Sequence, residues 1–229
     1  MIWLNKFLTR KLILRAGIII FGIASAIIAI ITYYGQNAGN FVMEIDPDAY
    51  RRGIVLSSDE EFLSPSPRLL SDAITNVRDI TYDWLKVDEA IATDGNYVDP
   101  DYKYIAYTLY IQNIGDETCD VNLNTSIVSI QNGLDAAIRF LIIEDGILEK
   151  MYMKPDTVEA EYHDLPEAEH FISDTTIMNS EISNFKPYQI KKFTVITWLE
   201  GQDPDCTDAI LGGRIKIRLL FSITSAEIG

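Results

Sequence analysis

The 229-residue chain has two cysteines, Cys119 and Cys206, whose thiols could act as a nucleophile or form a disulfide. A catalytic thiolate needs a base beside it, and the chain has only two histidines, His163 and His170. An even number of cysteines in an oxidising compartment favours a disulfide. We therefore predict a disulfide between Cys119 and Cys206, with two separate thiols as the alternative.

Two groups of aspartates have oxygen ligands at a spacing that Ca²⁺ accepts. The first group is Asp203, Asp205 and Asp208, and the second is Asp94, Asp99 and Asp101. Neither group follows the EF-hand pattern, and turns that use aspartate and proline for backbone reasons are the alternative. Calcium at Asp203, Asp205 and Asp208 is the metal site that we predict.

The stretch "EAEYHDLPEAEH" contains His163 and His170, which would share a face of a helix and could bind zinc. Pro166 interrupts a regular helix between them, so an acidic, solvated loop is favoured. The sequence contains no GxSxG, P-loop or SxxK motif, and no GxGxxG motif following a strand. We therefore predict no enzymatic activity.

The elements that would position these side chains follow an apolar segment. Residues 16–34, "AGIIIFGIASAIIAIITYY", form a run of nineteen uncharged residues, about the length that crosses a bilayer as a helix. Residues 1–15 contain four basic residues and no acid, which places them in the cytoplasm. We predict a transmembrane signal anchor at residues 16–34 and an extracellular domain at residues 39–229. A cleaved signal peptide is the alternative, although "GQNAGN" matches a cleavage site poorly.

The predicted exterior domain is strongly acidic. Residues 1–34 contain four of the 19 basic residues and none of the 34 acids, so 15 basic and 34 acidic residues remain, a net charge of −19. Such a domain repels nucleic acid and anionic lipid surfaces. Solubility outside the cell is the simplest explanation for this charge, and binding of divalent cations or cationic partners is the other.

Alternation of apolar and polar residues predicts strands along the exterior chain. The clearest segments are 39–46, 53–58, 102–113, 119–131, 136–144, 147–153, 189–200 and 213–223. Both faces of residues 102–113 are apolar or aromatic, which predicts a central strand. Asp145-Gly146 between two apolar runs predicts a hairpin turn.

Two segments are harder to assign. For residues 66–85 we expect a short helical turn after Pro67, followed by a strand. For residues 155–184, which are acidic and poorly periodic, we expect a long loop. Eight to ten strands with little helix predict one mainly β domain, an antiparallel β-sandwich of the jelly-roll or Ig-like type.

Three stretches carry a resemblance to known proteins: "YIAYTLYIQNIGDE" at 104–117, "AAIRFLII" at 136–143, and residues 184–223, which include "WLEGQDPDC". They resemble a family of single-pass surface proteins from Firmicutes and related bacteria that has no assigned activity. More distantly, the apolar leader, the "GNF" first strand and the β-sandwich resemble TasA and camelysin surface proteins. TasA-like chains are cleaved and form fibres, and camelysin is associated with proteolysis, but this chain has neither a good cleavage site nor a protease motif.

These patterns and the resemblance lead to one functional expectation. We expect a membrane-anchored extracellular protein with a structural, adhesion or matrix role, whose partners are the lipid bilayer, through residues 16–34, and either further copies of itself or another cell-surface protein. The alternative is an extracellular ligand-binding module or an accessory module of a membrane complex.

Overall fold

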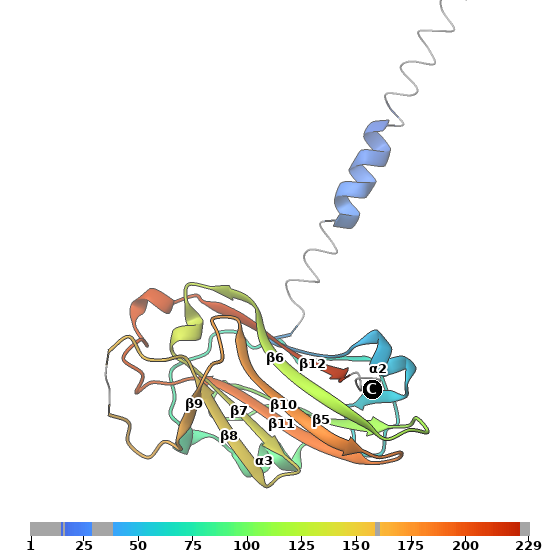
Figure 1. Cartoon of the computed structure of the whole chain (residues 1–229). Coiled ribbons are helices and arrows are strands. Elements are labelled where there is room, and N and C mark those ends of the chain that lie inside the picture. The colour runs from blue at the N-terminus through green and yellow to red at the C-terminus, as the bar shows by residue number, and fades with distance from the viewer. Residues whose placement is uncertain (1–14, 16, 29–38, 159–160, 225–229) are drawn as a thin grey trace, which may run out of the picture. The chain divides into compact units, whose positions relative to one another are not determined.

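The computed structural model of the chain describes residues 15, 17–28, 39–158 and 161–224. The chain divides into two compact units, residues 1–38 and 39–229 (Figure 1). In the first unit, residues 17–28 are helical. Within the described ranges, no helix combines the length and the apolar character that a membrane span requires. The predicted tail (1–15) and the predicted span (16–34) lie outside the described residues, apart from residue 15 and residues 17–28.

The second unit consists of two β-sheets. Sheet A has the strand order β10-β6-β12-β1-β3, and sheet B has the order β2-β5-β11-β7-β8-β9, with β4 paired to β5. The strands of sheet A are β1 (Phe41–Ile45), β3 (Arg68–Leu70), β6 (Cys119–Gln131), β10 (Thr176–Phe185) and β12 (Arg214–Ile223). Those of sheet B are β2 (Ile54–Ser57), β4 (Gly95–Tyr97), β5 (Ile105–Asn113), β7 (Ile138–Glu144), β8 (Leu148–Met153), β9 (Ala168–His170) and β11 (Ile190–Leu199).

Short helical elements lie between the strands. They are α2 (Pro47–Arg51), α3 (Val87–Ala92) and the 3-10 turns η1 (Tyr82–Trp84), η2 (Leu134–Ala136) and η3 (Asp208–Ile210). The structure therefore confirms a mainly β protein.

The main core lies between the two sheets because each strand presents every second side chain to it. Aromatic rings meet across this interface: the centroids of Phe41 and Phe140 are 6.3 Å apart, and those of Phe193 and Phe221 are 5.9 Å apart. All four rings are at most 2% exposed. Burial of this kind is the main term that stabilises the fold.

A second apolar cluster lies on the outer face of sheet B, under residues 82–94, which we call the covering segment. Leu85 and Ala90 of this segment are buried in the same cluster as Tyr104 and Leu141 of the sheet side. The sheet B strands are apolar on both faces because one face meets sheet A and the other meets this segment. This arrangement explains why β5 alternates between two buried faces, and it confirms β5 as a central strand.

The predicted hairpin at Asp145-Gly146 is confirmed. β7 and β8 pair in antiparallel register from Glu144↔Leu148 to Arg139↔Met153. Both turn residues have positive φ, 51° at Asp145 and 71° at Gly146, as the type I′ turn requires.

The prediction that all strand pairs are antiparallel is wrong. β1 pairs with β12 in parallel, and β8 pairs with β9 in parallel. β1 and β12 come from the two ends of the domain, so no local hairpin fixes their relative direction, and their sequence patterns are the same for either direction.

Two local predictions are also wrong. After Pro67 the chain forms strand β3 first, and the helical turn η1 comes later, which reverses the expected order. The predicted loop 155–184 contains β9 and most of β10. β10 is an edge strand with register shifts near both ends, at Thr176/Met178 and at Ile182/Phe185, so its apolar residues do not alternate regularly.

Candidate metal centre around Asp203

The loop after β11, residues 200–206, is held by segments from distant parts of the sequence. The Gly201 N–H donates to the Ile80 carbonyl at 2.9 Å. The Gln202 side chain donates to Thr81 Oγ1 at 2.9 Å and to the His163 carbonyl at 3.0 Å, and it accepts from the His163 N–H. The loop therefore joins the segment before η1 to the acidic segment that was predicted to be a loop.

A buried ion pair lies at the centre of this loop. Arg139 of β7 donates to Asp203 Oδ2 at 2.6 Å, and the two side chains are 1% and 0% exposed. Tyr162 covers the pair, with its ring centroid 5.1 Å from the guanidinium carbon. Burial raises the pKa of Asp203, and the hydrogen bond from Arg139 opposes that rise.

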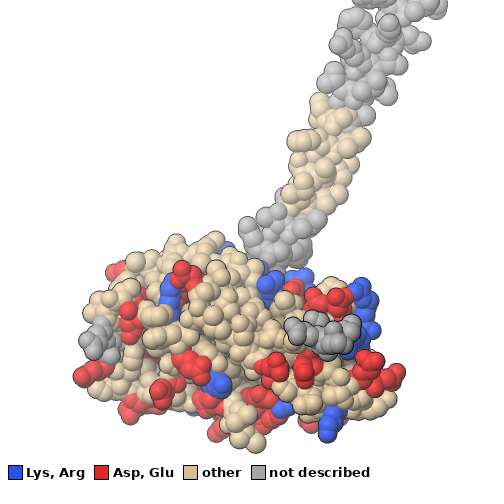
Figure 2. All heavy atoms as spheres, in the orientation of Figure 1, with Lys and Arg blue, Asp and Glu red and all other residues tan. Residues whose placement is uncertain are grey.

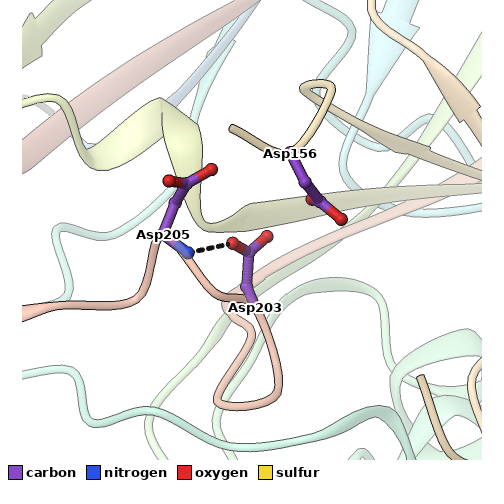
Figure 3. A group of neighbouring side chains, drawn as sticks. All are labelled: Asp156, Asp203 and Asp205. Atoms are coloured by element: carbon purple, nitrogen blue, oxygen red, sulfur yellow. Dashed lines mark hydrogen bonds between the residues drawn. The ribbon is translucent and has the colours of Figure 1, made fainter. Parts of the chain in front are cut away.

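Two of the three predicted calcium ligands lie together at this pair. Asp203 and Asp205 form a group with Asp156, in which one carboxylate oxygen of each residue lies within 4.8 Å of the others (Figure 3). Asp208, the third predicted ligand, is not in this group; it is exposed and begins η3. Asp156, which comes just after β8, was missed because it is 47 residues away in the sequence.

Most carboxylate oxygens of the group already accept hydrogen bonds. Asp203 Oδ1 accepts from the Asp205 N–H at 2.8 Å, and both oxygens of Asp205 accept from Thr157. Asp156 Oδ2 accepts from Tyr162 at 2.6 Å, whereas Asp156 Oδ1 is buried and has no partner within the described part of the chain. Three carboxylates against one guanidinium leave a net charge of −2.

The hydrogen bonds from Thr157 lower the pKa of Asp205. Because the folded-state pKa is below 3.8, this group contributes stability at pH values above 3.8, and the contribution is lost as the pH falls through the lowered pKa. The docking of residue 157 on the loop is therefore expected to weaken in acid.

The other predicted ligands serve different purposes. Asp99 Oδ1 accepts from the backbone N–H groups of Asp101 and Tyr102, and its Oδ2 accepts from Tyr104, so it fixes a turn. Asp94 accepts from Tyr110. His163 and His170 are both exposed, and among the described residues neither belongs to a metal-binding group.

The predicted disulfide is not present, because both cysteines are free thiols. Cys119 begins β6 of sheet A and lies 4.0 Å from the side chain of Asn113, which is at the end of sheet B where β11 begins. Cys206 follows Asp203, at the end where β11 finishes. The length of β11, about 30 Å, separates them, whereas bridged cysteines have Cα atoms within about 7 Å.

Neither thiol is activated. Burial raises the pKa of Cys119, and burial together with the nearby carboxylates of Asp79, Asp203 and Glu200 raises that of Cys206. A raised pKa keeps a thiol protonated and unreactive at neutral pH.

We call the loop at residues 200–206, together with Arg139, Asp156 and Trp198, the loop cluster. Two of its buried charged residues, Arg139 and Glu200, were not predicted from the sequence. Arg139 is the single charge in the apolar stretch "AAIRFLII". Because a buried arginine requires an acidic partner, this residue could have indicated a buried ion pair from the sequence alone. Glu200 is fully buried and accepts from the Trp198 indole N–H at 2.9 Å and from the Gln202 N–H at 3.0 Å.

Comparisons with known proteins do not show a family. No protein-family model matches the sequence, and no curated protein matches it. Among solved structures, two of a β-glucosidase from Kluyveromyces marxianus, one selenomethionine-labelled and one in complex with glucose, align with TM-scores of 0.22 at 13% and 11% identity. The alignments cover 72% of this chain and only 16% and 15% of those chains, and a likeness of this size carries no argument about fold or activity.

We expect calcium to bind weakly at Asp156, Asp203 and Asp205, because Arg139 competes with it for Asp203. Millimolar Ca²⁺ should raise the melting temperature of the chain by only about 1–3 °C. Arg139→Met removes the competing cation, so the same addition should stabilise this variant several-fold more. Differential scanning fluorimetry with Ca²⁺, Mg²⁺ and EDTA measures both shifts, with Asp208→Asn as the control that should behave as wild type. The absence of any Ca²⁺ effect on Arg139→Met would rule out the metal site.

Proposed function

We propose that this chain is a single-pass, membrane-anchored surface protein whose acidic domain, a β-sandwich of the jelly-roll or Ig-like class, has a structural, adhesion or matrix role outside the cell. The observation that carries the proposal is the apolar surface of helical residues 17–28. Seven large apolar side chains there are 51% to 76% exposed: Ile18, Ile19, Ile20, Phe21, Ile23, Ile27 and Ile28. Side chains of this kind around a helix suit lipid and not water.

The surrounding sequence supports the same proposal. The apolar run extends from residue 16 to residue 34, and the basic residues 1–15 precede it. The positive-inside rule then places residues 39–229, with their net charge of −19, outside the cell.

The chemistry of the domain supports a non-catalytic role. Both thiols have raised pKa values, and the carboxylates of the loop cluster are bonded to Arg139, Thr157 and Tyr162. These contacts connect segments of the fold, so the "WLEGQDPDC" stretch acts as a structural clasp formed by an ion pair.

One observation favours the alternative, an extracellular ligand-binding or accessory module. A hollow of about 630 Å³ lies beside α2, with Tyr50, Arg52, Ile114 and Glu117 in its lining. Tyr50 and Ile114 are 46% and 51% exposed there, and an aromatic ring beside an Arg52–Glu117 ion pair could hold a small polar ligand.

Membrane retention and surface exposure test the anchoring. Expressed in a bacterial host, the full chain should stay in the membrane pellet after alkaline carbonate washing, and protease added to intact cells should digest the acidic domain. An Ile20→Lys/Ile27→Lys variant should be lost from the pellet, since each lysine at the centre of a span costs about 2.5–3.5 kcal/mol. The matched Ile20→Leu/Ile27→Leu variant should be retained. Release of the wild-type chain by carbonate would contradict the proposal.

A further inference from the structure

The chain enters the domain through residues 39–41, which we call the entry segment. The Asn40 side chain donates to the Ile215 carbonyl at 3.1 Å and accepts from the Ile74 N–H at 2.8 Å. The Asn40 carbonyl also accepts from the Ile217 N–H at 2.8 Å. These bonds fix the first residues of the domain to sheet A from two sides.

Ser71 holds the same segment in place. A Cβ atom at Gly39 would overlap the Ser71 carbonyl oxygen, so a side chain there would force the backbone apart. The Phe41 N–H donates to Ser71 Oγ at 2.8 Å, and the Phe41 carbonyl accepts from the Ser71 N–H at 3.1 Å. Phe41 is fully buried in the main core. A pull on the chain that precedes Gly39 is therefore transmitted directly to β1.

β1 lies inside sheet A, between β12 and β3, and it pairs with β12 in parallel over five residues. Two backbone bonds of 2.8 Å mark the ends of this pairing. The Ile217 N–H donates to the Asn40 carbonyl at one end, and the Asp46 N–H donates to the Phe221 carbonyl at the other. Because the two strands run in the same direction, the start of β1 and the end of β12 lie at opposite ends of the pair.

This geometry decides how the pair responds to tension. When the start of β1 and the end of β12 are pulled apart, the strands slide along each other, so the hydrogen bonds between them must break together. The buried side chains of Phe41 and Met43 must also be drawn across the core. When both strands are pulled at the same end, the bonds open one after another. Single hydrogen bonds are weak in water, so the sliding direction resists a much greater force.

The far end of the pair is a place that a partner could hold. Ile223, at the end of β12, lines a hollow together with Asp48, Arg51 and Arg52, so α2 lies at the end of the pair opposite the entry segment. Figure 2 shows basic and acidic side chains together at this end, on the right, where Figure 1 labels α2. A partner bound there would pull along the strands if the chain is held at the entry segment.

We propose that β1 and β12 form a mechanical clamp, which keeps the acidic domain folded when a partner at the α2 end pulls against the membrane anchor. The clamp begins at the entry segment, so the tension reaches it without any free chain between. The proposal rests on the proposed function, since it gives an anchored structural or adhesion protein the means to resist force.

Optical tweezers on the full chain in non-ionic detergent compare two pulling directions. Cys119→Ser/Cys206→Ser removes the native thiols, and DNA handles are attached through introduced cysteines. Gln36→Cys with Thr224→Cys pulls the strands along each other, because Thr224 follows β12. Gln36→Cys with Leu211→Cys pulls both strands at the same end, because Leu211 precedes β12; both positions in the domain are exposed. At equal loading rates, the first handle pair should need a several-fold higher force to unfold the domain.

Asn40→Ala tests the entry segment. It removes the side-chain bonds to Ile215 and Ile74, so it should lower the unfolding force measured between the handles at residues 36 and 224. Asn179→Ala is the matched control, because it removes an asparagine of sheet A that bonds only with Asn124 of β6, away from β1. This control should unfold at the wild-type force. Circular dichroism must first show native strand content for every variant.

The comparison of directions decides the proposal. Equal forces for the two handle pairs, or a lower force between residues 36 and 224, would overturn it, and so would an Asn40→Ala chain that unfolds at the wild-type force. Carbonate retention measures the anchor separately. A chain that carbonate releases but that resists sliding would contradict the proposed function alone, whereas a retained chain with equal forces would contradict the clamp alone.

Discussion

Asp203→Asn is expected to lower the free energy of unfolding by about 3–5 kcal/mol, the usual cost of removing one member of a buried ion pair. Asparagine retains an oxygen that can accept the Asp205 N–H, so the change removes the charge and preserves the shape of the turn. The Arg139 guanidinium would then be buried, at 1% exposure, without a counter-charge. Chemical denaturation of the full chain, monitored by tryptophan fluorescence, measures the loss.

Two further variants separate charge from position. Asp208→Asn makes the same chemical change at an exposed site just after the loop and should alter stability by less than about 0.5 kcal/mol. Arg139→Met/Asp203→Leu removes both charges and should recover most of the loss, because apolar groups of similar volume can replace a buried pair. If Asp203→Asn were as stable as wild type, the ion-pair clasp would be disproved.

Trp198→Ala is expected to cost a similar amount, about 3–5 kcal/mol, the range for removing a large buried aromatic side chain. Trp198 is 1% exposed, and its ring packs against Tyr82 with centroids 6.1 Å apart. The indole N–H also donates to Glu200, whose side chain is completely buried. The substitution therefore creates a cavity and leaves a buried carboxylate with one donor fewer.

Trp84→Ala is the matched control, because Trp84 is half-exposed and also stacks on a tyrosine. It should cost about 1 kcal/mol. Trp198→Phe retains most of the ring and loses the hydrogen bond, so it should fall between the two. Equal losses for Trp84→Ala and Trp198→Ala in urea denaturation would show that the loop cluster does not stabilise the domain as we describe.

Much of the sheet structure could be predicted because alternation in strands reports which face is buried. β5 and the β7–β8 hairpin were predicted from residues that are neighbours in the sequence. The parallel pairing of β1 with β12 and the edge strand β10 could not be predicted in this way. The β1–β12 pairing depends on which distant strands meet. In β10, register shifts interrupt the alternation of apolar and polar residues.

The candidate site was predicted in part for the same reason. Asp203 and Asp205 were found because they are close in the sequence, whereas Asp156, just after β8, and Arg139, near the start of β7, are far away along the chain. The disulfide was predicted from the number of cysteines, which does not report that Cys119 and Cys206 lie at opposite ends of the sheets.

The mass of the mature chain tests the central claim, an uncleaved membrane anchor, most directly. Mass spectrometry of the chain extracted from the membrane fraction should give the mass of the full sequence, 25.9 kDa, with peptides from residues 1–34 present. A smaller chain that begins near residue 39 and is recovered from the medium would contradict the account.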